Sequence, residues 1–526
     1  MNIKCIQMPV WLVAFCCLIL LNCKPNEKSK TEVESITEKP NIVFIYLDDL
    51  GYGDVGAYGA TEINTPNIDK LAHDGLKFTN GYATSATCSP SRYAILTGTY
   101  PWRNEKAKIL AGDAPLLIGL DQPTIPKMLK DKGYQTAVVG KWHIGLGSGS
   151  VNWNEQVKPG PNEVGFDYSY IMAATQDRVP TVYVEDGHVV NLDPEDPIQV
   201  SYTDKLVGEP TGYANPELAT MKADKQHNNT IVNGVPRIGH MLGGKSARWS
   251  DIDMADHFLE KAQAYVKKQK DTDDPFFLYY ALQQPHVPRT PHPRFEGATG
   301  LGPRGDVIAE ADWVIGEFIN SLEKEGLLEN TLIVFSSDNG PILNDGYEDQ
   351  AEELLGDHTP SGIFRGGKYS LFEAGTRVPF VVYWKDKVKA GVSDALVSQI
   401  DLFSSLANLV GSEQTTPDSQ NLLDVFLGKK ADGRESYIVE AMSRTAFKQG
   451  DWVMIPPYKG PQKMWGKDVE TGNSKKHLLF NLAEDPEQQN NLAEMYTEKL
   501  KELIHNFEEI RGEDYKNSAA PQTEHP

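Results

Sequence analysis

The amino-acid sequence predicts an α/β fold, in which a doubly wound sheet is joined to a smaller antiparallel-sheet subdomain near the C-terminal end. Four apolar runs of strand length stop abruptly at polar residues, and such continuous runs are typical of parallel strands buried on both faces. Segments with helical periodicity separate the runs, and strands that alternate with helices indicate a doubly wound sheet. The four runs are residues 41–47, 136–139, 276–282 and 332–335.

Three helices are expected between these strands. Residues 65–75 begin with Thr-Pro and end at glycine, which is typical of a threonine N-cap, a proline in the first turn and a glycine stop. Residues 124–133 also start at threonine and end at glycine, and apolar side chains recur at helical spacing over residues 306–325. In doubly wound sheets ligands bind beyond the carboxyl ends of the strands. The polar residues that follow the four runs are therefore expected to converge on one site.

The end of the chain has a different pattern. Three short runs suit strands, and an amphipathic helix is expected near residues 492–510. We therefore expect a catalytic domain over residues 40–425 and a C-terminal antiparallel subdomain over residues 426–526. Residues 160–250 are rich in loop-forming residues and are expected to form walls of a substrate cleft. The three short runs are residues 436–439, 451–455 and 476–480.

The N-terminal segment is typical of an exported protein. The apolar run of residues 10–21 follows Lys4 and is too short to span a membrane, but it has the length of a signal-peptide core. Residues 20–23 (Leu-Leu-Asn-Cys) resemble a bacterial lipoprotein box, although asparagine replaces the usual small residue. We expect a lipoprotein-type signal peptide over residues 1–22 and a flexible tether over 23–39. The protein is then lipid-anchored to the bacterial cell envelope, facing the periplasm or the surface, or is periplasmic if it is not lipidated.

Charge and cysteine content narrow the function classes. The formal net charge is -22, which disfavours a nucleic-acid binder and requires that any anionic substrate be held in a local basic pocket. Four of the five cysteines lie in the first 23 residues, so only Cys88 remains in the body of the chain. An exported chain with a single internal cysteine has no internal disulfide framework. Cys88 is therefore either an inert buried residue or a reactive group.

The segment around Cys88 indicates an anion-binding helix terminus. Cys88-Ser89-Pro90-Ser91-Arg92 is followed closely by Leu96-Thr97-Gly98, and proline suits a first helical turn while glycine suits a helix end. Cys88 would then lie at a helix N-terminus, where free N–H groups and the helix dipole favour an anion. Arg92, one turn further along, can reach the same point.

Two polar pairs at strand ends suit a hard cation. Asp48 and Asp49 follow the first strand, and Asp338 and Asn339 follow the fourth. One such pair alone also suits a helix cap or a solvated turn, but two pairs at the same sheet edge favour a metal site. The pairs offer only oxygen ligands, which suit calcium or magnesium and argue against zinc.

These motifs resemble the formylglycine-dependent type I sulfatases, a branch of the alkaline phosphatase superfamily. The Cys88–Gly98 segment carries the family signature, cysteine-x-proline-x-arginine followed by leucine-threonine-glycine. The two polar pairs resemble the calcium ligands of the family. The resemblance covers roughly residues 40–380, and residues 479–486 are typical of the C-terminal subdomain of the family. Further matching segments, in the family order, are Gly140–His143, Gln284–His286 and Gly366–Lys368.

The resemblance implies a fold, a mechanism and a set of site residues. The fold would be alkaline-phosphatase-like, and a separate maturation enzyme would oxidise Cys88 to formylglycine (3-oxoalanine). One hydroxyl of the hydrated aldehyde would attack sulfur, and His143 would take the proton of the other to expel sulfate. His286 would protonate the leaving alcohol. The implied catalytic residues are Cys88, Arg92, Lys141, His143, His286 and Lys368. The implied ligands of Ca²⁺, or of Mg²⁺, are Asp48, Asp49, Cys88, Asp338 and Asn339.

Roles within these sets also follow from the resemblance. Arg92 and Lys141 would hold the nucleophile as an alkoxide, whereas His286 and Lys368 would bind sulfate oxygens. The cation would bind one sulfate oxygen and the nucleophile. Residues 176–178 and 237–240 are candidates for contacts with sugar hydroxyls, and equally suit ordinary polar loops.

The expected substrate is a sulfated polysaccharide or oligosaccharide, either algal (ulvan or carrageenan) or a glycosaminoglycan, by family analogy. The expected partners are this carbohydrate and the maturation enzyme, with no nucleic acid and with membrane contact only through the lipid anchor. Two alternatives remain open. One is a phosphonate monoester or phosphodiester hydrolase on the same fold, and the other is a non-catalytic glycan-binding surface lipoprotein.

Overall fold

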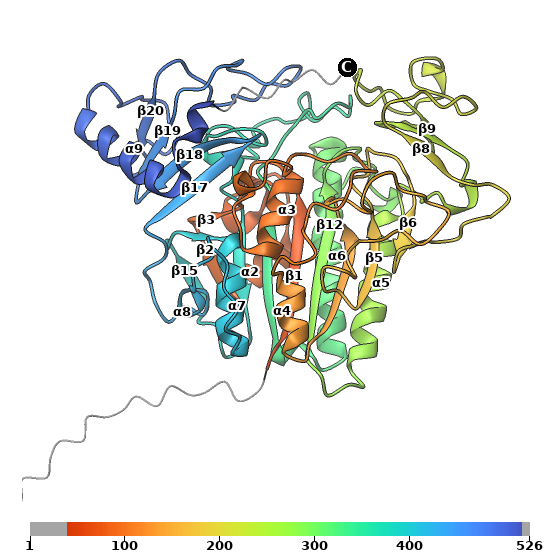
Figure 1. The fold of residues 1–526 in the computed structure, drawn as a ribbon, viewed down its shortest axis with the longest axis horizontal. Helices are drawn as coiled ribbons and strands as arrows, with labels where there is room; N and C mark the ends of the chain where they lie inside the picture. The colour runs from red at the N-terminus through yellow and green to blue at the C-terminus, as the bar shows by residue number, and fades with distance from the viewer. Residues whose placement is uncertain (1–38, 518–526) are drawn as a thin grey trace, which may run out of the picture. The chain divides into compact units, whose positions relative to one another are not determined.

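A ten-stranded sheet forms the centre of the computed structural model, which describes residues 39–517 (Figure 1). The predicted signal peptide and all but the last residue of the predicted tether lie outside the described residues. None of the described helices has the length and apolar composition that a membrane crossing needs. In spatial order the strands are β15 (Gly391–Ser393), β2 (Leu76–Phe78), β14 (Phe380–Tyr383), β13 (Thr331–Ser337), β1 (Asn41–Asp48), β12 (Phe276–Pro285), β4 (Gln135–Lys141), β5 (Tyr168–Met172), β6 (Tyr183–Glu185) and β7 (His188–Val189).

The four strands predicted from apolar runs are neighbours in the middle of this sheet. The segment β13-β1-β12-β4-β5 is parallel throughout, and Ile45 of β1 pairs with Phe335 of β13 and Tyr280 of β12. Every residue of β1, β12 and β13 is buried, as expected for strands covered on both faces. The predicted doubly wound α/β fold is confirmed, and the carboxyl ends of these strands lie at one edge of the sheet.

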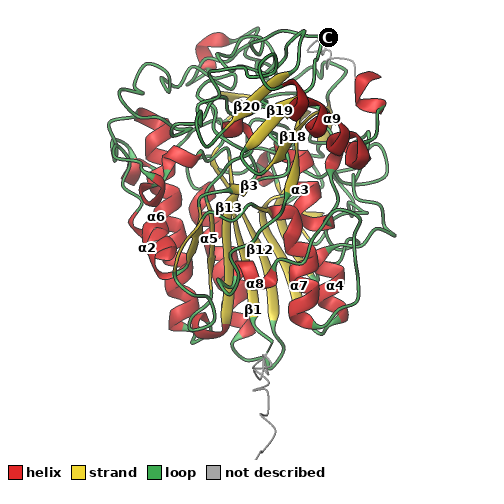
Figure 2. Cartoon of the chain, turned by 90° about the vertical axis from the view of Figure 1, so that its left-hand side faces the viewer, coloured by secondary structure: helices red, strands yellow, loops and turns green. Residues whose placement is uncertain are grey.

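Helices cover both faces of the sheet (Figure 2). On one face lie α2 (Pro66–Asp74), α5 (Met254–Gln269) and α6 (Gly302–Lys324), and on the other lie α3 (Cys88–Thr97), α4 (Ile125–Asp131) and α7 (Leu402–Val410). Apolar side chains of α2, α5 and α6 pack with alternate residues of the central strands in one large core cluster, which includes Ile68, Phe258 and Phe318.

The helix boundaries largely follow the predicted signals. The Thr124 side chain accepts a hydrogen bond from the Lys127 backbone at 3.3 Å and so caps α4. Helix α3 ends at Gly98, whose φ of 61° is the left-handed conformation that glycine adopts without steric cost. Helix α2 starts at the predicted position, but the Thr65 hydroxyl binds the Gly56 backbone and Asp69 instead of capping the helix.

The predicted C-terminal antiparallel sheet is also confirmed. Its strands share a core with residues close to the start of α3, and the Ala86 N–H donates to the Glu440 carbonyl at 2.8 Å. The predicted helix start near residue 492 is wrong, because the Asp485 and Asn491 side chains accept backbone N–H groups there and hold turns. The elements are β17 (Ser436–Ala441), β18 (Arg444–Gln449), β19 (Trp452–Ile455), β20 (Leu478–Asn481) and α9 (Thr497–Arg511).

The segment expected to be rich in loops carries β5 to β7 and two small two-stranded sheets. These sheets pair β8 (Gln199–Ser201) with β11 (His240–Leu242) and β9 (Ile231–Val232) with β10 (Val235–Pro236). The remaining short strands are β3 (Gly81–Tyr82) and β16 (Val397–Ser398), and the remaining α-helix is α8 (Leu423–Phe426).

Candidate active site

The predicted site residues meet at the carboxyl edge of the central sheet. Asp48 ends β1 and Lys141 ends β4, while Cys88 begins α3. All the predicted residues are nearly inaccessible, with exposed fractions from 0% for Asp48 to 4% for His286. The structure therefore brings together every predicted catalytic and metal-binding residue. Their individual roles remain predictions.

A buried cluster of possible ligand atoms, with oxygens from Asp48, Asp49 and Asn339, could hold a divalent cation. Ligand atoms of Asp48, Asp49, Cys88 and His286 all lie within 4.8 Å of one another. Asn339 donates to Asp49 Oδ1 at 2.7 Å, whereas its own Oδ1 is buried without a hydrogen-bond partner among the described residues. A buried amide oxygen with no donor is costly unless a cation or water meets it. The oxygen atoms of Asp48, Asp49 and Asn339 suit calcium or magnesium, whereas the unmodified Cys88 sulfur and the His286 nitrogen are not ligands that these ions prefer.

The electrostatics of the carboxylates support the same reading. Burial raises the pKa of Asp48 well above its usual value, and the nearby Asp338 carboxylate raises it further. Burial also raises the pKa of Asp49. Asp338 lies outside the 4.8 Å group; although burial alone would raise its pKa, Arg92 and Lys141 lower it. A bound cation would relieve the repulsion between these buried charges.

Three basic side chains pair with the acidic cluster. Arg92 binds Asp338 at 2.8 Å, Lys141 binds Asp48, and Lys368 lies 2.9 Å from Asp49. Arg92 also donates to the Lys141 carbonyl at 3.3 Å and covers the Tyr46 ring. These contacts fix Arg92, Lys141 and Lys368 beside the carboxylates, so three positive charges lie in the buried site.

Asp345 is a site residue that the sequence interpretation did not include. Its Oδ2 accepts from Lys368 Nζ at 2.8 Å, and its Oδ1 lies 2.5 Å from Lys467 Nζ. Asp345 lies on a loop after β13, without a strand end or a periodic pattern to mark it. Burial alone would lower the pKa of Lys368, but Asp345 and Asp49 raise it well above its usual value.

The unmodified Cys88 is poorly suited to be a nucleophile. Its Sγ lies 3.4 Å from Asp48 Oδ1, and burial together with this negative charge raises the pKa of the thiol well above its usual value. A protonated thiol is a weak nucleophile, and the surroundings of reactive cysteines are normally electropositive and partly exposed. The environment therefore favours either an inert cysteine or a modified one at this position.

The two predicted catalytic histidines have defined tautomers. His143 Nε2 lies 2.9 Å from the Leu110 carbonyl, which can only accept, so Nε2 carries the hydrogen. His143 Nδ1 has no hydrogen-bond partner among the described residues. Burial and the nearby Lys141 lower the pKa of His143 well below its usual value. His143 is therefore neutral, with Nδ1 available to accept a proton.

His286 has the opposite arrangement. Its Nδ1 lies 2.7 Å from the Val287 carbonyl and so carries the hydrogen, while Nε2 lies 3.9 Å from Asp49. Burial and Lys368 lower the pKa of His286 well below its usual value. To act as an acid it must gain a proton on Nε2, and the negative charge of a bound sulfate ester favours that protonation.

A second polar cluster includes part of the predicted sugar-contact segment. Arg178 Nη1 lies 2.9 Å from the Asp177 carboxylate, and His227 Nε2 lies 3.3 Å from Asp177. Burial alone would lower the pKa of His227, but hydrogen bonds to Asp177 and Asp224 raise it. His227 was not included in the sequence interpretation. Arg237 is different, because it is fully buried and ion-paired with Asp251 at 2.7 Å, which indicates a structural role.

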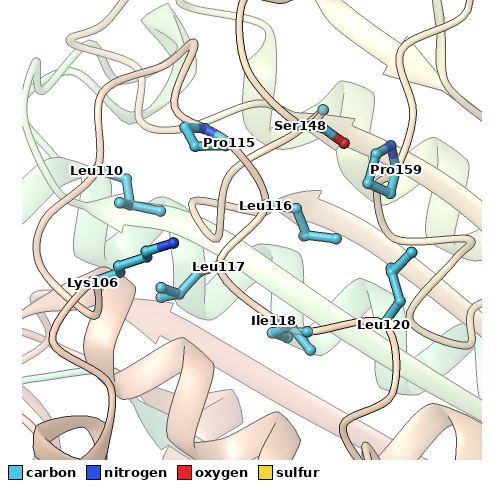
Figure 3. A pocket seen from close by; sticks show the side chains of 11 residues that line it. Lys106, Leu110, Pro115, Leu116, Leu117, Ile118, Leu120, Ser148 and Pro159 are labelled. Atoms are coloured by element: carbon cyan, nitrogen blue, oxygen red, sulfur yellow. The ribbon is translucent and has the colours of Figure 1, made fainter.

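An open pocket of about 460 Å³ is lined by Leu110, Leu116 and Pro159 among others (Figure 3). It is bounded by two loops, and Leu110, whose carbonyl meets His143, is one of its walls. The wall is mostly apolar, with Lys106 as its only charged side chain. The lining residues are Lys106, Leu110, Pro115, Leu116, Leu117, Ile118, Gly119, Leu120, Gly147, Ser148 and Pro159.

Comparisons with known proteins identify the family. A family model described as Sulfatase matches residues 40–412. The chain is 49% identical over 491 residues to an N-acetylgalactosamine-6-O-sulfatase of Bacteroides thetaiotaomicron, covering 92% of this chain and 96% of that protein. It is also 32% identical to human arylsulfatase A, over 76% of this chain and 70% of that protein.

A solved structure agrees with these matches. It comes from work on the metabolism of multiple glycosaminoglycans by B. thetaiotaomicron and superposes with a TM-score of 0.89 at 49% identity, covering 90% of this chain and 99% of that chain. The two named relatives are sulfatases, which favours sulfate esters over the phosphonate and phosphodiester alternatives and argues against the non-catalytic alternative. The chain therefore belongs to the sulfatase family and is a sulfuric ester hydrolase.

Proposed function

We propose that this enzyme removes the 6-O-sulfate from N-acetylgalactosamine units of a sulfated glycan, with a glycosaminoglycan as the substrate class. The observation that carries the proposal is the 49% identity, across almost the whole of both chains, to a relative named for that activity. The solved structure from glycosaminoglycan metabolism work supports the same substrate class. The proposal narrows the substrate expected from the sequence, which was either an algal polysaccharide or a glycosaminoglycan.

We further propose that Cys88 is converted to formylglycine and that calcium occupies the oxygen cluster. When present, the modified residue supplies the hydroxyl that attacks sulfur, and the cation supplies positive charge at the sulfate oxygens. Asp48, Asp49, Asp338 and Asn339 would hold the cation. The high pKa of the unmodified thiol supports the modification, since that thiol is a weak nucleophile.

The remaining steps belong to side chains of this chain. Lys368 binds a sulfate oxygen, and His286 Nε2 donates a proton to the oxygen of the departing alcohol. His143 Nδ1, which has no hydrogen-bond partner among the described residues, would accept the proton of the second hydroxyl of residue 88 as sulfate leaves. The buried site excludes water and strengthens each of these interactions.

We propose that the Asp177–Arg178–His227 cluster contacts hydroxyl groups of the sulfated sugar. Asp177 and His227 are buried. The charges of the cluster act on the catalytic histidines, because Arg178 adds to the lowering of the His143 pKa by burial and Lys141, and Asp177 partly offsets the lowering of the His286 pKa by burial and Lys368. A site that hydrogen-bonds a sugar hydroxyl rejects an epimer that misplaces it, because its buried polar groups are then left unpaired.

The substrate proposal predicts positional selectivity. Sulfate release should be fast from N-acetylgalactosamine 6-sulfate and at least about 100-fold slower from the 4-sulfate or from N-acetylglucosamine 6-sulfate. Ion chromatography of free sulfate measures all three rates, and Cys88→Ala protein controls for contaminating sulfatases. Equal rates for the 6- and 4-sulfates would refute the assignment.

Metal removal should abolish activity and lower stability together. The cause is the loss of charge compensation for Asp48, Asp49 and Asp338. Calcium at about 100 times its Kd should add about 2.7 kcal/mol to the free energy of unfolding of the chelated protein. The test is to add calcium or zinc to the chelated enzyme and to measure turnover and thermal unfolding. We expect activity and stability to recover with calcium only. Undiminished turnover by protein shown to be metal-free would exclude the metal role.

We also propose export and lipid anchoring through Cys23, supported by the apolar run of residues 10–21 and the Leu-Leu-Asn-Cys box. The N-terminal peptide of protein purified from bacterial membranes should carry a lipid on Cys23. An unmodified N-terminus in the periplasmic fraction would instead indicate ordinary signal cleavage.

A further inference from the structure

A loop of the C-terminal subdomain reaches the active site. Residues 462–470 form a closed loop, in which the Met464 N–H donates to the Val469 carbonyl at 2.8 Å. The base of the loop is anchored beside the catalytic segment, because Glu470 accepts from Arg365 at 2.6 Å and its carbonyl accepts from the Ser370 hydroxyl at 2.5 Å. Arg365 and Ser370 flank Lys368, so the loop is fixed next to the proposed sulfate-binding lysine.

Lys467 places a second positive charge at this point. Its Nζ lies 2.5 Å from Asp345 Oδ1, and the other oxygen of Asp345 lies 2.8 Å from Lys368 Nζ. The Lys467 side chain is 11% exposed, so it is partly accessible from outside. An ammonium group has three N–H donors, and the Asp345 contact uses one of them. Lys467 can therefore bind an anion next to the sulfate that Lys368 binds.

Trp465 precedes Lys467 by two residues and is exposed. Its exposed fraction is 67%, and no ring or cation stacks on it among the described residues. A single exposed apolar side chain is common on protein surfaces, so the interest of Trp465 comes from its place in the loop that carries Lys467. Tryptophan offers a large ring face for stacking. The C–H groups on one face of a sugar ring provide the matching apolar surface.

We propose that Trp465 and Lys467 form a second sugar-binding subsite, which holds the glycosyl unit adjacent to the sulfated one. Trp465 stacks on that sugar, and Lys467 binds an anionic group on it, either a carboxylate or a second sulfate. The inference rests on the proposed function and extends it from one sugar to an anionic oligosaccharide. The net charge of -22 repels an anionic oligosaccharide, and the positive charge of Lys467 would oppose that repulsion at this position.

The test compares Trp465→Ala and Lys467→Met enzyme on four substrates. These are N-acetylgalactosamine 6-sulfate alone and three disaccharides of it, whose second sugar is neutral, a uronic acid, or sulfated. Lys463→Met is the matched control, because Lys463 is in the same loop but is 61% exposed and pairs with Asp468. The disaccharide arms separate a carboxylate from a sulfate as the group that Lys467 binds.

We expect Trp465→Ala to raise the KM of all three disaccharides by about 10-fold and to leave the monosaccharide unchanged. Lys467→Met should lower the disaccharide-to-monosaccharide ratio of kcat/KM by about 10- to 100-fold, only where the second sugar is anionic. Lys463→Met should behave as wild type. Calorimetric titration of Cys88→Ala protein with the same ligands should show the same order of affinities without turnover.

Several outcomes would overturn the subsite. Equal losses on mono- and disaccharides for Lys467→Met would mean that it only positions Asp345 and Lys368. Wild-type enzyme that prefers the monosaccharide, or a Trp465→Ala enzyme with unchanged disaccharide KM, would also refute it. If wild-type enzyme neither binds nor desulfates any of the four ligands, the proposed function falls together with the subsite.

Discussion

Enzyme with Cys88 replaced by alanine is expected to lose sulfate release by at least about 10,000-fold, since the substitution removes the proposed nucleophile, which is the only cysteine among the described residues. The wild-type thiol is itself unsuited, because burial and Asp48 raise its pKa. An active preparation should therefore carry formylglycine at Cys88, seen by peptide mass spectrometry as a loss of sulfur and a gain of oxygen.

The comparison needs a folded variant. Cys88→Ala removes one sulfur at the start of α3 and leaves Arg92 and Asp338 paired, so its thermal unfolding in calcium should stay close to that of wild type. Activity should track the fraction of modified Cys88 across preparations. Full activity in protein whose thiol is entirely unmodified would reject the nucleophile assignment.

The second large effect is expected for His286→Ala, and its size should depend on the leaving group. A sugar alkoxide needs a proton as it departs, whereas a nitrophenolate largely does not. General acid catalysis contributes about 100- to 10,000-fold, so the variant should lose that factor on a sulfated sugar and much less on an activated aryl sulfate. Steady-state kcat/KM on both substrates measures the difference.

His292→Ala is the matched control for this prediction. His292 follows His286 on the same segment but is 29% exposed and lies 3.9 Å from Asp253, away from the acidic cluster. The His292→Ala enzyme should react with both substrates at the wild-type rate. If His286→Ala instead loses activity equally on both substrates, His286 only binds sulfate, and Lys368 becomes the next candidate for the acid.

The central strands could be predicted because their burial shows directly in the sequence. Strands β1, β12 and β13 are apolar throughout their cores, and each ends in residues too polar to be buried without a partner. The short strands at one end of the sheet could not be predicted in the same way. Strands β2 and β15 have three residues each, and their place depends on pairing across the sheet rather than on their own composition.

The site residues also fall into a group that the sequence predicted and a group that it did not. Asp48, Lys141 and His286 could be located because each lies at or just beyond the end of a parallel strand. Asp345 and His227 could not, because each lies on a loop whose course is set by tertiary packing. Lys467 comes from a different subdomain altogether, and no local pattern connects it with the Cys88 motif.

The hydrogen bond between Ala86 and Glu440 bears on whether Cys88 is modified before or after the chain folds. Cys88 is 2% exposed in the folded protein, and the strand that carries Glu440 covers the segment just before it. The proposed maturation enzyme would need access to Cys88, which the folded chain buries at the start of α3. Strand β17 is synthesised long after Cys88 has left the ribosome. If Cys88 is oxidised as proposed, the modification should therefore precede the docking of β17, and protein that is exposed to the maturation enzyme only after folding should keep its thiol.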